Sequence, residues 1–252
     1  MNTLLEGKKI VIMGVVNKSS IAWGCVEAMR DCGAFIIYTY QNDRVKRQLE
    51  KLVGADAPMV ECDVATDEDV EKAFNEISTK YGTIDGLVHS IAFARKEELE
   101  GSLLDASREG FSIAHDVSAF SLIAVSKYAS KIMNRGGSIA TMTYIGSHRA
   151  VPNYNVMGVA KASLESIVKY LAVDLASQDI RINAISAGAI KTLASSGIKG
   201  FQQLLDSASE RTPSDKPVTT REVGNTAAFL MSDLSTGVNG DTIYVDKGTH
   251  LS

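Results

Sequence analysis

Short apolar runs alternate with amphipathic or charged segments along the whole of this 252-residue chain. The runs have the length of strands, and the segments between them have the length of helices. A strand, a helix and a second strand in succession form a unit whose strands pair in parallel through a right-handed crossover. Repetition of this unit predicts an α/β fold: a single-domain, Rossmann-like, doubly wound parallel sheet of about seven strands with helices on both faces. No Pro/Gly/Ser-rich linker divides the chain, so we expect one domain that spans residues 1–252.

The expected elements follow from apolar periodicity and from capping and turn residues. Strands are predicted at 8–13, 34–40, 58–64, 84–92, 138–143, 181–186 and 241–245. Helices are predicted at 21–32, 43–52, 66–81, 109–133, 154–176 and 221–231. Thr66 and Asp69 have the spacing of a capping box, and Asn153 is expected to cap the helix that follows Pro152. Residues 189–216 have little regular pattern and follow a strand end, which suits a mobile lid rather than a plain surface loop.

Composition limits the class of protein. The net charge is −4 and the pI is about 5.6, which argues against nucleic-acid binding because such proteins carry a basic excess. No apolar run is long enough to span a membrane, and the first residues lack the pattern expected of a signal peptide, so we expect none. The three cysteines lack metal-ligand spacing, so we expect buried thiols in a cytoplasmic protein without a metal site.

The residues that directly follow the predicted strands are the candidates for ligand binding. Open parallel sheets bind ligands outside the carboxyl ends of their strands, near the switch in strand order. Gly14 allows a tight exit from the first strand, and Ser20 and Ile21 begin a helix whose free amides and dipole suit a pyrophosphate. Gly24 is expected to allow close packing of this helix on the sheet. The turn departs from the usual glycine fingerprint, but its position favours a dinucleotide over an ordinary turn.

The residues after the second and third strands bear on the choice of dinucleotide. Gln41 is neutral and suits ribose hydroxyls, whereas a 2′-phosphate calls for a nearby arginine. The cations that follow, Arg44, Lys46 and Arg47, are interpreted as a solvated helix face. We therefore favour NADH over NADPH. Asp63 is a candidate to accept from the adenine amino group, the alternative being an ordinary turn acid.

Two tyrosines and a lysine form the candidate catalytic group. Tyr144 follows the fifth predicted strand, and Tyr154 precedes Lys161 by seven residues, which is nearly two helical turns. That spacing places the phenol of Tyr154 and the ammonium of Lys161 on one helix face. A tyrosine and a lysine at this spacing are more often a packed ring and a solvated charge, so the pair alone is weak evidence of catalysis.

Longer stretches of the chain carry a resemblance to a known family. They are Gly14…Ser20-Ile21-Ala22-x-Gly24, Thr39–Asp43, Cys62-Asp63-Val64, His89–Ala94, Arg149–Glu165 and Ile185–Gly188. Together they resemble the enoyl-[acyl-carrier-protein] reductases, a divergent branch of the short-chain dehydrogenases/reductases, over essentially the whole chain. The most specific mark is the lysine seven residues after Tyr154. Ordinary members of the superfamily have the lysine at the fourth position, where this chain has Gly158.

The resemblance implies a reaction. A hydride passes from the reduced nicotinamide to the β-carbon of a trans-2-enoyl thioester on acyl carrier protein, in fatty acid elongation. The catalytic residues implied are Tyr154, which stabilises the enolate oxygen, Lys161, which also binds the nicotinamide ribose, and Tyr144 close by. Further cofactor contacts are implied for Val64, Ile91, Ile190, Lys191, Thr192, Leu193 and Ala194. Substrate contacts are implied for Ala94, Met157, Ile198 and Phe201, with a lid over about 194–205. The family is commonly homotetrameric, and we expect the same.

Departures from the family pattern keep alternatives open. Lys199 stands near the expected carrier-docking surface, but Gln202 and Gln203 occupy neighbouring positions. Lys247 stands where a glycine pair is more usual. A related ketone or alcohol reductase is the nearest rival, against which Gly158 argues. A catalytically silent dinucleotide-binding protein is a rival from another class, against which Tyr154 and Lys161 argue.

Overall fold

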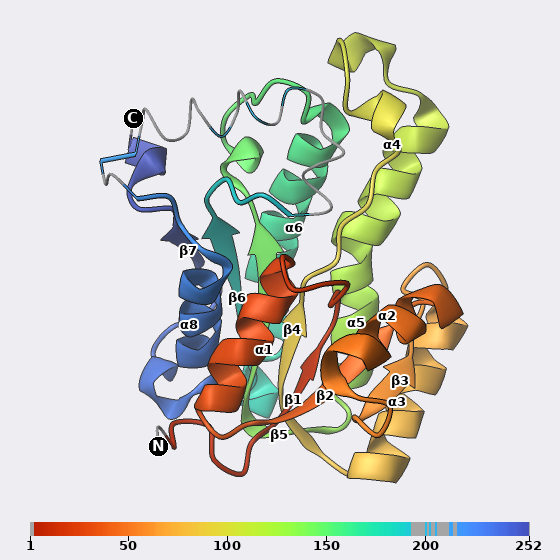
Figure 1. The fold of residues 1–252 in the computed structure, drawn as a ribbon, viewed down its shortest axis with the longest axis vertical. Helices are drawn as coiled ribbons and strands as arrows, with labels where there is room; N and C mark the ends of the chain where they lie inside the picture. Colours follow the sequence, from red (N-terminus) through yellow and green to blue (C-terminus); the bar gives the residue numbers. More distant parts are fainter. Residues whose placement is uncertain are drawn as a thin grey trace.

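The computed structural model describes residues 3–192, 200, 202, 205, 212–213 and 216–251. Seven parallel strands form one sheet in the order β3-β2-β1-β4-β5-β6-β7 (Figure 1). They are β1 (Lys9–Ile12), β2 (Phe35–Tyr40), β3 (Met59–Glu61), β4 (Ile84–His89), β5 (Met133–Thr143), β6 (Arg181–Ala187) and β7 (Thr242–Val245). The order reverses between β1 and β4, because β2 and β3 extend the sheet on one side and β5 to β7 on the other. The predicted fold class is confirmed.

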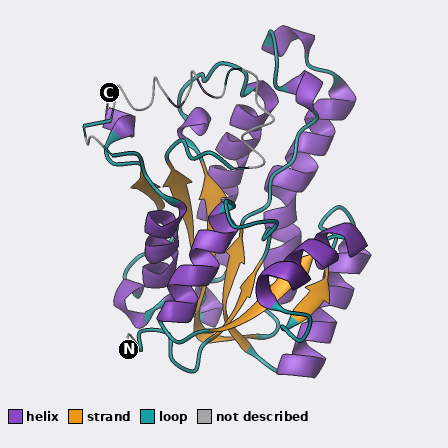
Figure 2. Ribbon diagram, in the orientation of Figure 1, coloured by secondary structure: helices purple, strands orange, loops and turns teal. Residues whose placement is uncertain are grey.

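Helices cover both faces of the sheet (Figure 2). Buried residues of α1 (Ile21–Asp31), α2 (Asp43–Val53) and α8 (Thr220–Met231) belong to one apolar cluster. Those of α3 (Asp67–Tyr81), α5 (Ser121–Ala129) and α6 (Asn155–Asp174) belong to the other. In β1, Ile10 and Ile12 enter the first cluster, whereas Val11 and Met13, the residue directly after the strand, enter the second. This alternation is the two-residue period of a strand buried on both faces.

The other helical segments that the described residues delimit are short. They are α4 (Arg108–His115), the π-turn η3 (Asp116–Phe120), and the 3₁₀ turns η1 (Lys96–Glu98), η2 (Leu103–Asp105), η4 (Ile145–Ser147), η5 (Ala176–Gln178), η7 (Asp233–Ser235) and η8 (Thr249–Leu251). The long helix predicted at 109–133 was therefore wrong in two respects. The π-turn η3 separates α4 from α5, and helix ends at Ala129 because Ile132 already pairs with Ile84 of β4.

Two other sequence predictions need correction. Asn153 has a left-handed φ of 58° and lies outside α6, whose cap position is Tyr154 with no side-chain cap hydrogen bond.

Gly24 of α1 does contact a neighbouring element closely, but that element is α8 and not the sheet. A β-carbon on Gly24 would lie 2.1 Å from the carbonyl oxygen of Thr220, and one on Gly224 would lie 2.1 Å from the carbonyl oxygen of Gly24. The two helices pack backbone to backbone because both positions are glycine.

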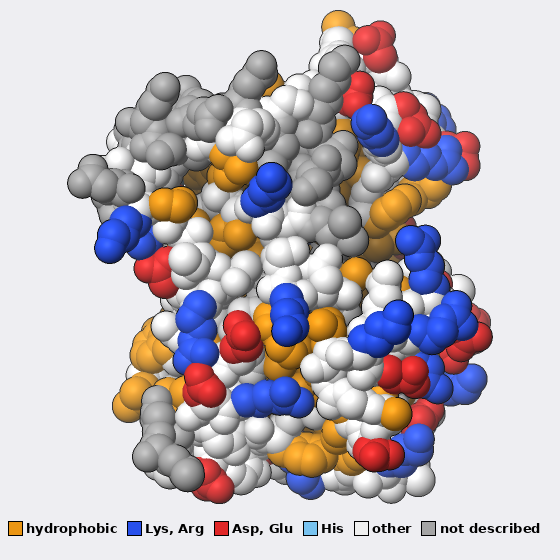
Figure 3. All heavy atoms as spheres, in the orientation of Figure 1, with side chains coloured by type: hydrophobic (Ala, Val, Ile, Leu, Met, Phe, Trp, Pro, Cys, Tyr) orange, Lys and Arg blue, Asp and Glu red, His pale blue; other side chains and the backbone are white. Residues whose placement is uncertain are grey.

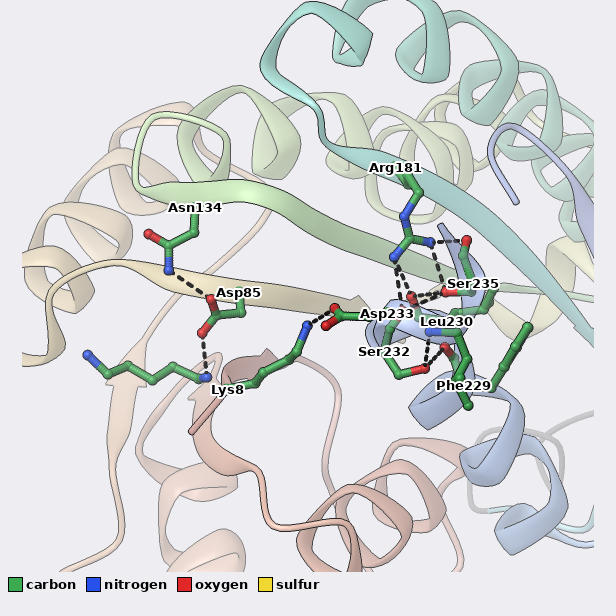
Figure 4. Close-up of polar contacts among 11 residues, drawn as sticks. Lys8, Asp85, Asn134, Arg181, Phe229, Leu230, Ser232, Asp233 and Ser235 are labelled. Carbon is green, nitrogen blue, oxygen red and sulfur yellow. Dashed lines mark hydrogen bonds and ion pairs between the residues drawn. The ribbon is translucent and has the colours of Figure 1, made fainter. Parts of the chain in front are cut away.

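A buried arginine fixes the C-terminal end of α8. One guanidinium nitrogen of Arg181 in β6 donates to the carbonyl and hydroxyl oxygens of Ser235 at 2.9 Å each (Figure 4). The other donates to the carbonyl of Leu230 at 3.1 Å. The last carbonyl groups of a helix have no partner within the helix. Arg181 supplies a hydrogen bond to one of them, the carbonyl of Leu230, and joins the end of α8 and the following η7 turn to the sheet from the edge opposite the candidate site.

The prediction that the cysteines are buried thiols is confirmed, since Cys25, Cys32 and Cys62 are all free and buried. Burial raises the pKa of the Cys25 thiol to about 12. Among the described residues, no helix has the length and apolar content that crossing a membrane requires.

Candidate active site

The candidate site lies at the carboxyl edge of the sheet, where the strand order reverses. Gly14 leaves β1 with a φ of 86° and lies against Ser90, which follows β4. A β-carbon at Gly14 would lie 2.0 Å from the Ser90 carbonyl oxygen, so only glycine fits there. The absent side chain leaves the backbone bare at the crevice between β1 and β4, which is where open α/β sheets bind nucleotides.

The N-terminus of α1 opens onto this crevice. Ser20 caps the helix by accepting from the amide of Trp23 at 3.2 Å and donating to the carbonyl of Asn17 at 2.8 Å. Ile21 begins the helix. The first turn carries no acidic residue, so the positive end of the helix dipole is not neutralised. These features fit a pyrophosphate, which free amides and the dipole stabilise.

Gln41 and Asp63 meet at the end of β2 and β3. The amide nitrogen of Gln41 donates to one carboxylate oxygen of Asp63 at 3.2 Å, and the other oxygen accepts from the amide of Ala65 at 3.1 Å. Asp63 thus also has the turn role that the alternative interpretation gave it. Val64 beside it is buried. The pair offers a neutral donor and an acceptor to an adenosine.

The other predicted contact residues follow β4 and β6 at the same edge. Ile91 packs partly against the second apolar cluster and Ile190 against the first. Ala94 and Thr192 are half-buried, Lys191 is exposed, and Met157 on α6 is buried. Leu193, Ala194, Ile198, Lys199, Phe201 and Gln203 lie outside the described residues, as does most of the predicted lid.

Tyr144 and Tyr154 lie together at the end of β5. Their ring centroids are 5.1 Å apart with an interplanar angle of 69°, an edge-to-face contact. Burial raises the pKa of Tyr144 to about 12. Burial, with a smaller contribution from Tyr144, also raises the pKa of Tyr154. Both phenols therefore keep their protons at neutral pH and are available as hydrogen-bond donors.

Lys161 lies two turns into α6 and is buried. Its ammonium donates to the carbonyl of Met142 at 2.8 Å, which ties α6 to β5 directly before Tyr144. Burial lowers the pKa of Lys161 to about 8, and the opposite charge of Glu165 counteracts part of that shift. Most of the lysine is therefore charged at neutral pH. A desolvated ammonium and protonated phenols are groups that can stabilise a developing oxyanion.

Two buried polar residues near this group have contacts that the sequence did not reveal. Glu165, one turn after Lys161, accepts from Thr143 and Ser147 at 2.6 Å each. His89 at the end of β4 bonds Thr141 at 3.0 Å and Ser121 at 2.9 Å. Both residues fall within the stretches that resemble the family, but a buried carboxylate and a buried imidazole have no signature in linear spacing. Their partners come from other elements, so only the fold identifies them.

The hydrogen bonds of His89 determine its tautomer. The Ser121 hydroxyl donates to the carbonyl of Val117 at 2.7 Å, so it accepts from Nε2 of the imidazole. Nδ1 then accepts from Thr141. Burial, with a smaller effect of Lys161, lowers the pKa of His89 to about 3. This histidine is neutral at physiological pH and contributes structure beneath the site.

Comparison with known proteins bears on this geometry. A family model described as "Enoyl-(Acyl carrier protein) reductase" matches residues 14–250. The enoyl-[acyl-carrier-protein] reductase [NADH] of Enterococcus faecalis is 58% identical, covering 98% of this chain and 99% of its own. The enzyme of Staphylococcus aureus MRSA252, named for NADPH, is 50% identical over 98% of both chains. The crystal structure of the Bacillus cereus enoyl-acyl carrier protein reductase with NADP⁺ and indole naphthyridinone superposes with a TM-score of 0.96, at 48% identity, over 99% of this chain and 98% of that one.

The sheet order, the glycine turn at the strand switch and the Tyr154–Lys161 pair on α6 define a nucleotide-dependent oxidoreductase of the short-chain dehydrogenase/reductase class. Within that class, the family match extends over nearly the entire chain and includes the region of Gly158 and Lys161. The chain belongs to the enoyl-[acyl-carrier-protein] reductase family.

Proposed function

We propose that this protein reduces the 2,3 double bond of trans-2-enoyl thioesters carried by acyl carrier protein, with NADH as the hydride source. The observation that carries the proposal is the edge-to-face Tyr144–Tyr154 pair at the carboxyl end of β5, together with the buried Lys161 ammonium, which bonds the carbonyl of Met142 two residues before Tyr144. The high identity to named reductases of this reaction supports it.

The residues fit the roles that such a reaction needs. The reduced nicotinamide, when bound, supplies the hydride. Addition at the β-carbon moves negative charge onto the thioester oxygen, and a donor aimed at that oxygen stabilises the transition state more than the substrate. Tyr154 is the proposed donor, because its raised pKa keeps the phenol protonated. Lys161 is proposed to hold the nicotinamide ribose and to add positive charge. Tyr144 packs against Tyr154 and limits its orientation.

The preference for NADH over NADPH rests on Gln41 and Asp63. An adenosine 2′-phosphate at this corner would meet the carboxylate of Asp63, to which Gln41 is bonded. Basic side chains gather over α2, with acidic ones among them, on the face shown in Figure 3. One of them, Lys46, lies over the ring of Tyr40, with its ammonium 5.7 Å from the centroid. Family membership leaves both cofactors open, because curated relatives are named for each.

The decisive assay follows absorbance of the reduced nicotinamide with a crotonyl or longer enoyl thioester. We expect oxidation with NADH, a lower kcat/KM with NADPH, and losses of about 10²- to 10³-fold in Tyr154→Phe and Lys161→Ala, the range for removal of one oxyanion donor. Faster turnover of a 3-ketoacyl thioester would instead assign the chain to the ketone reductases. Cofactor binding without oxidation of either nicotinamide would favour a silent binding protein.

The acyl carrier partner is part of this proposal. Carrier proteins are acidic, so a cation near the lid is the expected contact, and Lys199 is the candidate, although it lies outside the described residues. Lys199→Glu should raise KM for the carrier-linked substrate more than for the coenzyme A thioester of the same chain. Equal effects on the two substrates would remove Lys199 from the docking surface.

We also propose that the active form is a homotetramer. A groove of about 800 Å³ runs along α4, η3, α5 and α6 and is lined by Phe111, Phe120, Ile123 and Ile167 among others. The first three side chains are between 36% and 46% exposed, which leaves an unusually apolar helix face in contact with water. A surface of this kind favours burial against a second copy of the same face.

The proposed place of action is the cytoplasm. All three cysteines are free thiols, which suits a reducing compartment. Activity that separates with the soluble fraction of gently broken cells would support this, and activity that sediments with membranes would contradict it.

A further inference from the structure

Glu165 is a buried carboxylate that the proposed chemistry does not use. It lies on α6 one turn after Lys161, with 5% of its surface exposed. One carboxylate oxygen accepts from the hydroxyls of Thr143 and Ser147, each at 2.6 Å. The other lies 2.8 Å from Nε2 of His148. A charge this deep is tolerated because several donors compensate its lost hydration.

These three partners flank Tyr144 on both sides. Thr143 is the last residue of β5, and Ser147 and His148 close the 3₁₀ turn that follows Tyr144. Tyr144 has an extended backbone with φ of −149° between them. Glu165 therefore anchors the entry and the exit of the short segment that carries Tyr144.

Lys161 adds a further anchor to the same segment. Its ammonium bonds the carbonyl of Met142, directly before Thr143. One face of α6, over the single turn from Lys161 to Glu165, thus holds residues 142, 143, 147 and 148. Tyr154 stands at the beginning of the same helix. The edge-to-face contact of Tyr144 and Tyr154 is consequently set by how this segment is tied to α6.

We propose that Glu165 is a positioning residue, whose carboxylate ties the 143–148 segment to α6 and so holds Tyr144 against Tyr154 in the arrangement that reduction requires. The inference rests on the proposed reductase function for its kinetic readout. An amide at this position has one acceptor oxygen in place of two, and its NH₂ can donate to Nε2 of His148 in the tautomer that carries its proton on Nδ1. Glutamine should therefore preserve part of the anchor, and alanine none of it.

The test compares Glu165→Ala and Glu165→Gln with Ser166→Ala, an exposed neighbour on α6. We expect Glu165→Ala to lower kcat for the enoyl thioester at least 10-fold while the dissociation constant of NADH changes less than 3-fold. Glu165→Gln should recover a substantial part of kcat, and Ser166→Ala should match the unaltered protein. The near-ultraviolet circular dichroism of the tyrosine pair should change in Glu165→Ala, and this change should be absent when Tyr144→Phe is already present.

A folded Glu165→Ala variant with unaltered kcat and unaltered tyrosine dichroism would overturn the proposal. Because alanine leaves a void, a second variant, Ser147→Ala with His148→Ala, removes two anchors from the more exposed side. This double variant should also lower kcat. If its kcat and its tyrosine dichroism were both unaltered, the proposal would be overturned, even if Glu165→Ala failed to fold. If the unaltered protein reduced no enoyl thioester, the reductase function would fail separately, and the tyrosine dichroism would still decide the role of Glu165.

Discussion

Gly158 of α6 lies against the backbone of Gly146 in the turn after β5. A β-carbon at Gly158 would lie 2.8 Å from the Gly146 carbonyl oxygen, and one at Gly146 would lie 2.6 Å from a ring carbon of Tyr154. The position at which ordinary members of the superfamily have their lysine is therefore closed by backbone here. The lysine is found one turn further along, at Lys161, because the turn containing Gly146 occupies the space beside Gly158.

This contact predicts that Gly158→Ala is harmful, although alanine normally stabilises a helix interior by about 0.5–1 kcal/mol over glycine. The added methyl must displace the Gly146 turn and with it Tyr144 and Tyr154. We expect kcat to fall about 10- to 100-fold, the scale of a misplaced catalytic group, and the free energy of unfolding to fall by about 1–3 kcal/mol, the cost of overpacking. Steady-state kinetics and urea unfolding measure the two. A more stable, fully active variant would contradict the assigned contact.

The lowered pKa of Lys161 predicts a pH limit on activity. The charged form is the one that stabilises an oxyanion, and its pKa is about 8. We therefore expect kcat/KM to decline as pH rises through about 8, whereas the tyrosines, with raised pKa values, stay protonated. The charge that acts on this titration is that of Glu165 on the same helix, which raises the pKa of Lys161 against the larger effect of burial.

Removal of the Glu165 charge should shift that limit. The carboxylate raises the pKa of Lys161, so Glu165→Gln is expected to move the decline in kcat/KM to lower pH. The profile is measured from pH 6 to 10 with the enoyl thioester at subsaturating concentration. A decline at the same pH in both proteins would show that another group controls the alkaline limb.

The lowered pKa of His89 predicts how the free energy of unfolding changes as the pH falls. Its pKa is about 3 in the folded protein, below the ordinary value of 6.5. Between those values the unfolded chain binds a proton that the folded chain does not, so stability is present above about pH 6.5 and is lost as pH falls. The loss approaches about 1.4 kcal/mol per pH unit in that interval.

Urea unfolding at pH 7 and pH 5, at one protein concentration, provides the measurement. The difference between the two pH values should be smaller in His89→Gln by about 2 kcal/mol, from the same linkage relation. His89→Gln is expected to be less stable at pH 7, because the bonds to Thr141 and Ser121 are altered. An identical pH dependence in both proteins would remove His89 as the cause.

The apolar groove predicts the effect of a charge on assembly. Phe120 is 46% exposed within it, so Phe120→Glu would bury a carboxylate in the proposed subunit contact, which is unfavourable without a partner. Light scattering should give about four times the chain mass for the unaltered protein and a smaller mass for the variant. Leu234→Glu is the matched control, because Leu234 is 70% exposed on η7, outside the groove. Equal loss of assembly in both variants would argue against this face.

Apolar periodicity predicted the succession of strands and helices along the chain, because burial on both faces of a parallel sheet constrains the residues of every strand. The general rule for open parallel sheets then predicted that the candidate site lies at the carboxyl ends of the strands. The details it missed depend on tertiary contacts. The continuous helix predicted at 109–133 is interrupted where Ser118 bonds the backbone of Phe93, with its hydroxyl donating at 3.0 Å and accepting at 2.9 Å. Asn153 looked like a cap from its residue type, but its left-handed backbone places it in the turn before α6.

In the candidate site too, the sequence identified some residues, and others became evident only from the fold. Gly14, Ser20, Gln41, Asp63, Tyr144, Tyr154 and Lys161 were identifiable because they follow strand ends or share a helix face. The partners of Glu165 and the facing glycines 146 and 158 could not be identified from the sequence. Which of these residues meet depends on how closely β5 and α6 pack in the fold. The alternative that Lys161 is a solvated charge is excluded, because the ammonium is buried on the Met142 carbonyl.

The glycine contact between α1 and α8 also has a bearing on biosynthesis. α1 carries the amides proposed to bind pyrophosphate, but the face that it buries is completed by a helix near the other end of the chain. A ribosome that has made the first βαβ unit has therefore made a helix without its packing partner. The nucleotide site is expected to mature only after α8 has emerged, and chain fragments that end before Thr220 should be substrates for chaperones and proteases rather than independent nucleotide binders.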